Sequence, residues 1–159
     1  MKQSIILSCA LAAAVLLAIP ATGAAQDAGK EVFSTRCSAC HQANAQGVPG
    51  MYPPLAGSEW VNGDKDQVIR IVLHGLEGDL EVKGDYFSGT MPPWGQALSD
   101  SEIAAVLTYV RSNFGNSASA VTEADVAKIR AATASRTKPW SADELKALAK
   151  KDGGKKPAK

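Results

Sequence analysis

Cysteine and aromatic residues are scarce in this sequence. Its 159 residues include only three Cys, three Phe, three Tyr and three Trp. Cys9 lies in an apolar N-terminal segment, which leaves Cys37 and Cys40 as one close pair for the rest of the chain. One such pair excludes the framework of several disulfides found in many small exported proteins. The few aromatics predict a modest core for a single domain, unless a large apolar group joins it.

Long hydrophobic runs are absent beyond the N-terminus. Residues 5–19 carry no charge, but this run is shorter than the roughly 20 residues that span a bilayer. Lys2 precedes the run, and Pro20 and the small residues 21–25 follow it. This layout is typical of a secretory signal peptide, with a membrane anchor as the alternative. We therefore predict that residues 1–25 are a signal peptide cleaved near Ala25, and that the mature chain is periplasmic without a membrane span.

An excess of one charge sign is also absent overall, because two opposite parts cancel to a net charge of +1. Residues 26–114 carry 6 Lys and Arg against 11 Asp and Glu, whereas residues 115–159 carry 10 against 5. Such asymmetry indicates a separate segment. We predict a domain over residues 26–115, a basic helical extension over 116–150 and a disordered tail over 151–159. The basic extension could fold against the acidic domain or bind an acidic partner.

Apolar residues recur with helical spacing, and no segment shows the convincing alternation of a strand. Helices are predicted at residues 27–40, 66–73, 99–114, 122–133 and 141–150. Residues 99–102 form a capping box, Asp64 is a candidate N-cap, and Gly75 is a stop signal. Segments 47–57 and 75–95 are rich in Gly and Pro, and loops of this length in a compact domain are usually functional.

The run Cys37-Ser38-Ala39-Cys40-His41 is the C-x-x-C-H signature of c-type haem attachment. Two thiols three residues apart at the end of a helix can each add to one vinyl group of haem, and the adjacent imidazole then binds the iron. A thioredoxin-type pair would need a βαβ setting, which is not visible, and tetrahedral zinc would lack a ligand. A plain disulfide would leave His41 unexplained. We therefore predict one covalently attached haem c per chain.

Several motifs along residues 28–115 resemble class I cytochrome c in their order. They are Gly29-Lys30-Glu31-Val32-Phe33, the C-x-x-C-H run, Pro53-Pro54-Leu55, Gly89-Thr90-Met91-Pro92-Pro93 and the helix at 99–114. The resemblance implies an all-α fold, with three to five helices wrapped around one covalently attached haem and, here, a short helical C-terminal extension. It also implies that the first helix crosses the last helix of the domain at Gly29, with Gly29 and Phe33 against Val106 and Tyr109.

The same resemblance implies two axial ligands for the iron. His41 would bind through one ring nitrogen and donate its other N–H to the carbonyl of Pro53. Met91 would supply a neutral thioether, which raises the reduction potential. Met51 is the rival methionine, which we assign to packing, and His74 is a less favoured alternative that would give bis-His coordination.

Three aromatic residues are further candidates for contact with the haem. Tyr52 and Trp60 could reach the haem propionates through their O–H and N–H groups, and Trp94 could pack over the segment that contains Met91. Core packing is the alternative for each of them.

With both axial positions filled, the iron would transfer electrons through the exposed haem edge and would not bind a substrate. We therefore expect an electron carrier, not an enzyme. Its partners would be redox proteins, namely a dehydrogenase and an oxidase or reductase, with no nucleic acid, and the chain would be a monomer or a subunit of a complex. Residues 105–116 and the following tail resemble cytochrome subunits of dehydrogenases, which makes a fixed electron-transfer subunit an alternative. If Met91 is not bound, a haem peroxidase or gas-binding protein is another.

Overall fold

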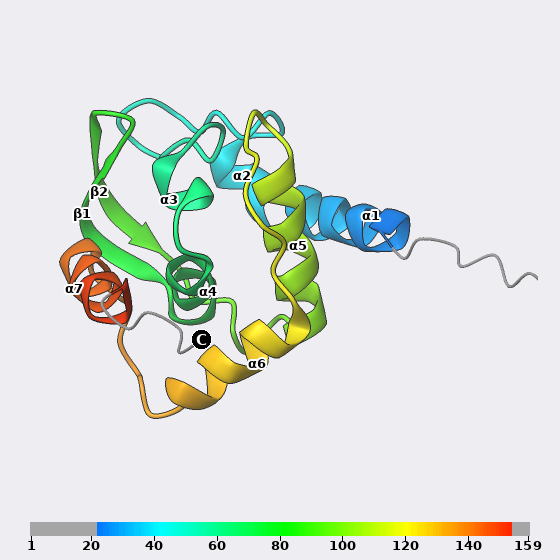
Figure 1. Ribbon diagram of the computed structural model, residues 1–159. Helices are drawn as coiled ribbons and strands as arrows, with labels where there is room; N and C mark the ends of the chain where they lie inside the picture. The colour runs from blue at the N-terminus through cyan, green and yellow to red at the C-terminus, as the bar shows by residue number, and fades with distance from the viewer. Residues whose placement is uncertain (1–21, 154–159) are drawn as a thin grey trace, which may run out of the picture.

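The computed structural model describes residues 22–153, and its first elements are three helical segments in direct succession (Figure 1). Helix α1 (Thr22–Val32), the π-helical turn η1 (Phe33–Cys37) and α2 (Ser38–His41) correspond to the first predicted helix, which begins earlier than expected. Most of the predicted signal peptide and the end of the predicted tail lie outside the described residues.

Helix α1 crosses α5 (Asp100–Ser112) where Gly29 allows close contact (Figure 1). A Cβ atom on Gly29 would lie only 2.7 Å from the Cβ of Tyr109, so no larger residue fits without displacement. The rings of Phe33 and Tyr109 have their centroids 5.9 Å apart, and Phe33 shares a buried cluster with Val106. The crossing predicted at these residues is confirmed.

Side-chain caps begin two of the next helices where the sequence predicted them. The short helix α3 (Glu59–Asn62) was not predicted. In α4 (Lys65–His74), which follows it, the Asp64 side chain accepts a hydrogen bond from the N–H of Asp66, as expected for an N-cap. Gly75 ends α4 with a φ of 81°. At the start of α5, the capping box of residues 99–102 has both of its reciprocal hydrogen bonds.

Segment 75–95, which the sequence analysis treated as a loop, contains an antiparallel hairpin. Strand β1 (Leu76–Val82) pairs with β2 (Asp85–Met91), so that Leu76 lies opposite Met91. Lys83 and Gly84 form the connecting turn with φ values of 56° and 85°, and positive φ at both central residues is the geometry of tight hairpin turns. The expectation that the chain contains no strand was wrong here, while helices still dominate the fold as predicted.

Helix α6 (Glu123–Ala132) packs across α4 and α5 (Figure 1). Its residues Val126 and Ile129 are buried in one cluster with Leu73 of α4 and Ile103 and Leu107 of α5. Apolar burial of this kind stabilises each side chain by about 1.5–3 kcal/mol. The first half of the predicted extension is therefore part of the main core.

Helix α7 (Ala142–Gly153) lies against β1 (Figure 1). Trp140 and Leu145 are buried with the apolar face of the hairpin. The N–H of Trp140 donates to the carbonyl of Gly75 at 3.0 Å, and the carbonyl of Trp140 accepts from the N–H of Glu77 at 2.9 Å. The extension folds against the rest of the chain, which is one of the two outcomes expected from its charge.

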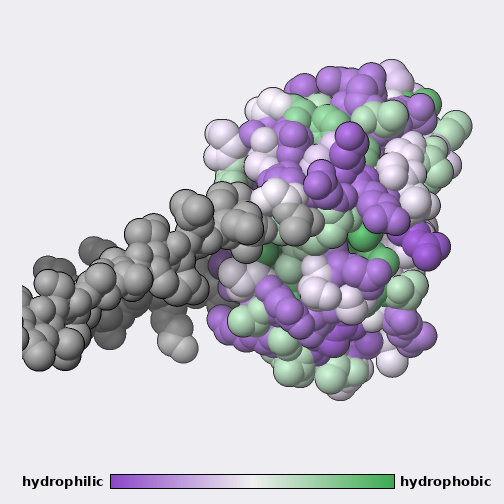
Figure 2. Space-filling view, turned by 90° about the vertical axis from the view of Figure 1, so that its right-hand side faces the viewer, coloured by the Kyte–Doolittle hydropathy of each residue, from purple (hydrophilic) through white to green (hydrophobic). Residues whose placement is uncertain are grey.

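The face of the molecule shown in Figure 2 is largely hydrophilic where it is coloured, with apolar residues scattered in small groups. Within residues 22–153, no helix combines the length and hydropathy needed to cross a membrane.

Candidate functional site

A cavity of about 440 Å³ lies between α2, the segment 51–55, α4, the hairpin and α5. Its walls are mostly apolar, as is usual for sites that hold a large organic cofactor. All seven residues that the sequence analysis assigned to the cofactor line it: Cys37, Cys40, His41, Tyr52, Pro53, Trp60 and Met91.

The two cysteines lie on one short helical stretch at the wall of the cavity. The turn η1 ends at Cys37, and α2 then carries Cys40 and His41. Both cysteines are free thiols and are not fully buried. Burial, with a smaller contribution from Cys40, raises the pKa of the Cys37 thiol to about 11. Two free thiols one helical turn apart form the donor set that two thioether bonds to one haem require.

His41 is held in one tautomer and one orientation. Its Nδ1 lies 3.0 Å from the carbonyl oxygen of Pro53, and because a carbonyl only accepts, Nδ1 carries the proton. Nε2 is then left with a lone pair. Burial lowers the pKa of the His41 imidazole, and the hydrogen bond to Pro53 opposes this in part. A neutral imidazole with a fixed ring is the state that binds a metal.

Gly47 packs closely against the carbonyl of Pro53. The N–H of Gly47 donates to the carbonyl of His41 at 2.9 Å, and the N–H of Val48 donates to the carbonyl of Tyr52 at 2.8 Å. Gly47 has a φ of 66°, and a Cβ atom on it would lie 2.7 Å from the Pro53 oxygen. Only glycine meets both conditions without strain.

Met91 is the last residue of β2 and is half-buried. It packs against the cluster formed by the hairpin and α7. Pro92 and Trp94 also line the cavity after it, and the N–H of Trp94 donates to the carbonyl of Val72 at 2.8 Å, which ties this segment to α4. The position of Met91 is therefore set by a strand and not by a loose loop.

Trp60 differs from the sequence expectation. Its indole N–H donates to the carbonyl of Glu81 at 3.0 Å, so the donor expected to reach a haem propionate is used within the protein. Trp60 thus contributes its apolar ring to the wall of the cavity. Tyr52 also lines the cavity, next to Pro53.

His74 and Met51, the two rival ligands, do not share the positions of His41 and Met91 in the cavity. His74 is not among the residues that line the cavity; its Nε2 lies 2.7 Å from Thr133 Oγ1, which itself donates to the carbonyl of Ile129. Met51 is at the rim and is 59% exposed.

Sequence reasoning missed two parts of the wall. The first is the apolar face of the hairpin, formed by Leu80, Val82 and Phe87; the alternation at Leu80 and Val82 and the following Gly84 were its signals. The second is Arg111, a buried residue of α5 that no sequence signal marked as part of the site.

The fixed imidazole, the two free thiols and the apolar cavity fit a haem attached through Cys37 and Cys40. These features define a c-type haem protein. Residues 26–114 match the family model described as Cytochrome c, which covers more than half of the chain. The chain therefore belongs to the cytochrome c family and is a class I c-type cytochrome, with covalently bound haem c and a role in electron transfer.

Curated relatives agree with this assignment. The chain is 38% identical over 128 residues to cytochrome c-552 of Thermus thermophilus, with 78% of this chain and 76% of the relative covered. It is 34% identical over 105 residues to the cytochrome c subunit of an alcohol dehydrogenase (quinone) of Gluconacetobacter polyoxogenes, with 64% of this chain but only 22% of the relative covered. It is 34% identical over 95 residues to subunit CcoP of a cbb3-type cytochrome c oxidase of Azospirillum brasilense, with 56% of this chain and 28% of the relative covered.

Proposed function

We propose that the protein is an exported one-electron carrier in which His41 and Met91 hold the haem iron from its two axial positions. The bound haem supplies one-electron exchange between ferric and ferrous iron. With both positions taken by protein ligands, substrates have no access to the metal, so the protein is not an enzyme. The partners would be redox proteins that bind through small interfaces, as is usual for electron carriers.

The hydrogen bond between His41 and Pro53 carries this proposal. It leaves Nε2 as the only ring nitrogen able to bind iron, and it increases the basicity of the ligand. Met91 supports it because a thioether in the same apolar cavity is a soft, neutral ligand that favours ferrous iron.

Replacement of Met91 tests the ligation. The mature chain would be produced in a host that assembles c-type cytochromes, and the oxidised protein examined for the weak charge-transfer band at the red edge of the spectrum that marks a methionine–iron bond. We expect Met91→Ala to lose this band, become high-spin and take up imidazole. Met51→Ala, which changes a methionine at the cavity rim, should keep the band. Retention of the band in Met91→Ala would contradict the proposal.

A fixed subunit of a larger redox complex is the second candidate. The relatives include cytochrome c subunits of dehydrogenases and of an oxidase, although the chain spans under a third of each of those relatives. Cell fractionation followed by affinity capture distinguishes a free carrier from a fixed subunit. A soluble periplasmic protein that is captured alone supports the carrier; stoichiometric capture with a dehydrogenase or oxidase supports the subunit.

A further inference from the structure

A second recess, of about 310 Å³, lies next to the cavity described above, and we call it the Trp60 recess. Residues from four elements line it: Glu59 and Trp60 of α3, Gln67 of α4, Glu81 of β1 and Lys146 of α7. Among the described residues, Trp60 alone lines both the recess and the cavity of the candidate haem site. The side chain of Trp60 is therefore part of the wall between this recess and the haem site.

Hydrogen bonds hold the walls of the Trp60 recess together. The indole N–H of Trp60 donates to the carbonyl of Glu81 at 3.0 Å, which joins α3 to the end of β1. The side-chain amide of Gln67 donates to the carbonyl of Leu145 at 3.0 Å, which joins α4 to α7. Because both contacts fix backbone and side chain together, a group bound in the recess would lie at a set position relative to the cavity.

The charges in the Trp60 recess are only partly balanced. Glu59 and Glu81 contribute two exposed carboxylates, whereas Lys146 contributes one ammonium group. None of the ion pairs formed within residues 22–153 involves these three side chains. The carboxylate of Glu59 instead accepts from the backbone N–H of Lys83 at 3.0 and 3.1 Å, which fixes its position. The recess therefore keeps one excess negative charge.

Lys146 shows which kind of group the recess accepts. Its Nζ lies 5.8 Å from the centroid of the Trp60 ring, at the outer limit of a cation–π contact. The side chain of Lys146 is exposed, and a lysine held only by a long contact of this kind is displaced at little cost. An aromatic face flanked by carboxylates is suited to a cationic side chain.

We propose that the Trp60 recess is a docking site for a protein redox partner, whose lysine or arginine side chain takes the place of Lys146 on the ring of Trp60. The inference rests on the proposed electron-carrier function and adds a surface for its partner. Only the Trp60 side chain would separate this contact from the cavity, and electron transfer is faster over a shorter separation. One electron passes from the partner, which is oxidised, to ferric iron, which is reduced, and no bond or proton is exchanged.

A paramagnetic cation tests the binding step. Hexaamminechromium(III) broadens the NMR signals of protons close to it, and it would be added at low salt to the ferrous, haem-loaded protein. We expect it to broaden the indole N–H signal of Trp60 and not that of Trp140, whose indole nitrogen is buried. Glu81→Gln should weaken the broadening. Equal broadening of both signals, or broadening of neither, would overturn the inference.

Reduction of the ferric protein by hexaammineruthenium(II), a cationic one-electron reductant, tests the transfer step. At low ionic strength, Glu81→Gln should slow it about threefold, and Lys146→Gln should accelerate it by about the same factor, since the two variants change the charge of the recess in opposite directions. Glu77→Gln and Lys150→Gln are the matched controls. Each makes the same change of charge on the same element at an exposed position outside the recess, so each should have a smaller effect.

Equal rates in Glu81→Gln and Glu77→Gln would mean that only the net charge of the protein matters, and this would overturn the inference. The same holds for equal rates in Lys146→Gln and Lys150→Gln. Ascorbate, an anionic reductant, keeps the two proposals apart. A wild-type ferric protein that neither reductant converts to the ferrous state would refute the electron carrier, whereas normal reduction without a difference between variants and controls would refute only the Trp60 recess.

Discussion

Gly47 affects the orientation of the His41 imidazole through the carbonyl of Pro53. The side chain of His41 is oriented by the Pro53 carbonyl, and the backbone of Gly47 lies directly against that carbonyl. The C-x-x-C-H run made His41 predictable from sequence, since the attachment chemistry needs this spacing. The role of Gly47 was not predictable, because a positive φ and a close approach to another backbone become visible only in three dimensions.

Gly47→Ala adds only one methyl group, but it should destabilise the folded protein substantially. The added methyl group must displace the Pro53 carbonyl, and the alanine must also adopt a φ of 66°. We therefore expect a loss of about 2 kcal/mol or more in the free energy of unfolding. Urea unfolding of the haem-loaded protein measures this loss. Gly50→Ala is the control, since Gly50 has a φ of 72° but open space around its Cβ position. Equal losses in both variants would mean that the contact with Pro53 contributes nothing.

At the scale of elements, the hairpin is the part that sequence analysis did not find. In β1 the exposed positions are Glu77, Asp79 and Glu81, residue types that strands disfavour, and Gly78 interrupts the apolar face between Leu76 and Leu80. The turn of the hairpin is Lys83-Gly84 in place of the stronger Asn-Gly signal. The longer helices were predictable from the sequence because their capping signals are local. Asp64, the capping box at residues 99–102 and the box at the start of α6 each act within four residues.

The contact between α7 and the hairpin should support Met91. Leu145 of α7 is fully buried against the hairpin, so Leu145→Ala should cost about 2–5 kcal/mol and weaken the proposed methionine–iron bond. The midpoint of alkaline loss of the methionine–iron band measures the second effect, and urea unfolding the first. Val126→Ala, at a fully buried position of α6 outside this contact, should reduce stability with a smaller shift of the alkaline midpoint. Identical alkaline midpoints in the two variants would show that α7 does not support the ligand.

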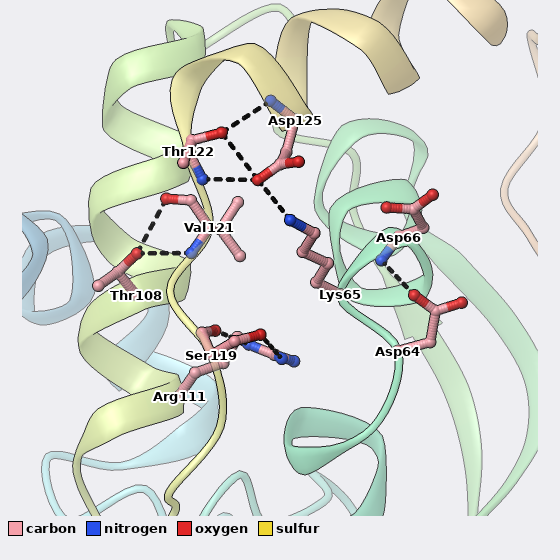
Figure 3. Close-up of polar contacts among 9 residues, drawn as sticks. All are labelled: Asp64, Lys65, Asp66, Thr108, Arg111, Ser119, Val121, Thr122 and Asp125. Atoms are coloured by element: carbon pink, nitrogen blue, oxygen red, sulfur yellow. Dashed lines mark hydrogen bonds and ion pairs between the residues drawn. The ribbon is translucent and has the colours of Figure 1, made fainter. Parts of the chain in front are cut away.

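An ion pair joins α6 to α4 through Asp125 and Lys65, whose side-chain atoms lie 2.7 Å apart (Figure 3). The hydrogen bond from Lys65 and those from Thr122 lower the pKa of the Asp125 carboxyl from 3.8 to about 2. The folded protein thus binds this proton more weakly than the unfolded chain does. The stabilisation is complete above a pH of about 4 and is lost as the pH falls through about 2.

We expect Asp125→Asn to lose about 1 kcal/mol of stability at neutral pH, a value reduced for solvent screening because both side chains are partly exposed. Urea unfolding followed by the helical circular dichroism signal at pH 7, 4 and 2.5 measures the difference from the wild type. This difference should shrink at the lowest pH. Glu123→Gln, which changes another carboxylate of the first turn of α6, should show a smaller and less pH-dependent effect. A constant difference at all three pH values would contradict the linkage.

At the scale of the whole molecule, sequence analysis predicted the family, the order of the longer helices and seven of the residues that line the cavity. It treated the C-terminal extension as separable because charge asymmetry was the visible signal. The structure shows mainly apolar contacts, in which α6 contributes to the core between α4 and α5 and α7 covers the hairpin. Among the described residues, the ion pairs between the extension and the rest also run in both directions: Lys65 of α4 pairs with Asp125, whereas Asp100 of α5 pairs with Arg130. Net charge could not reveal this arrangement, because a few buried apolar side chains outweigh exposed charges in free energy.

The position of α7 on β1 has a consequence for the order of assembly. Synthesis proceeds from the N-terminus, so Cys37, Cys40 and His41 emerge long before Leu145, which backs the strand pair that ends in Met91. The residues that would hold the haem covalently are therefore available before α7 can complete the hairpin side of the cavity. The last described helix, α7, is thus the element that completes this side of the cavity.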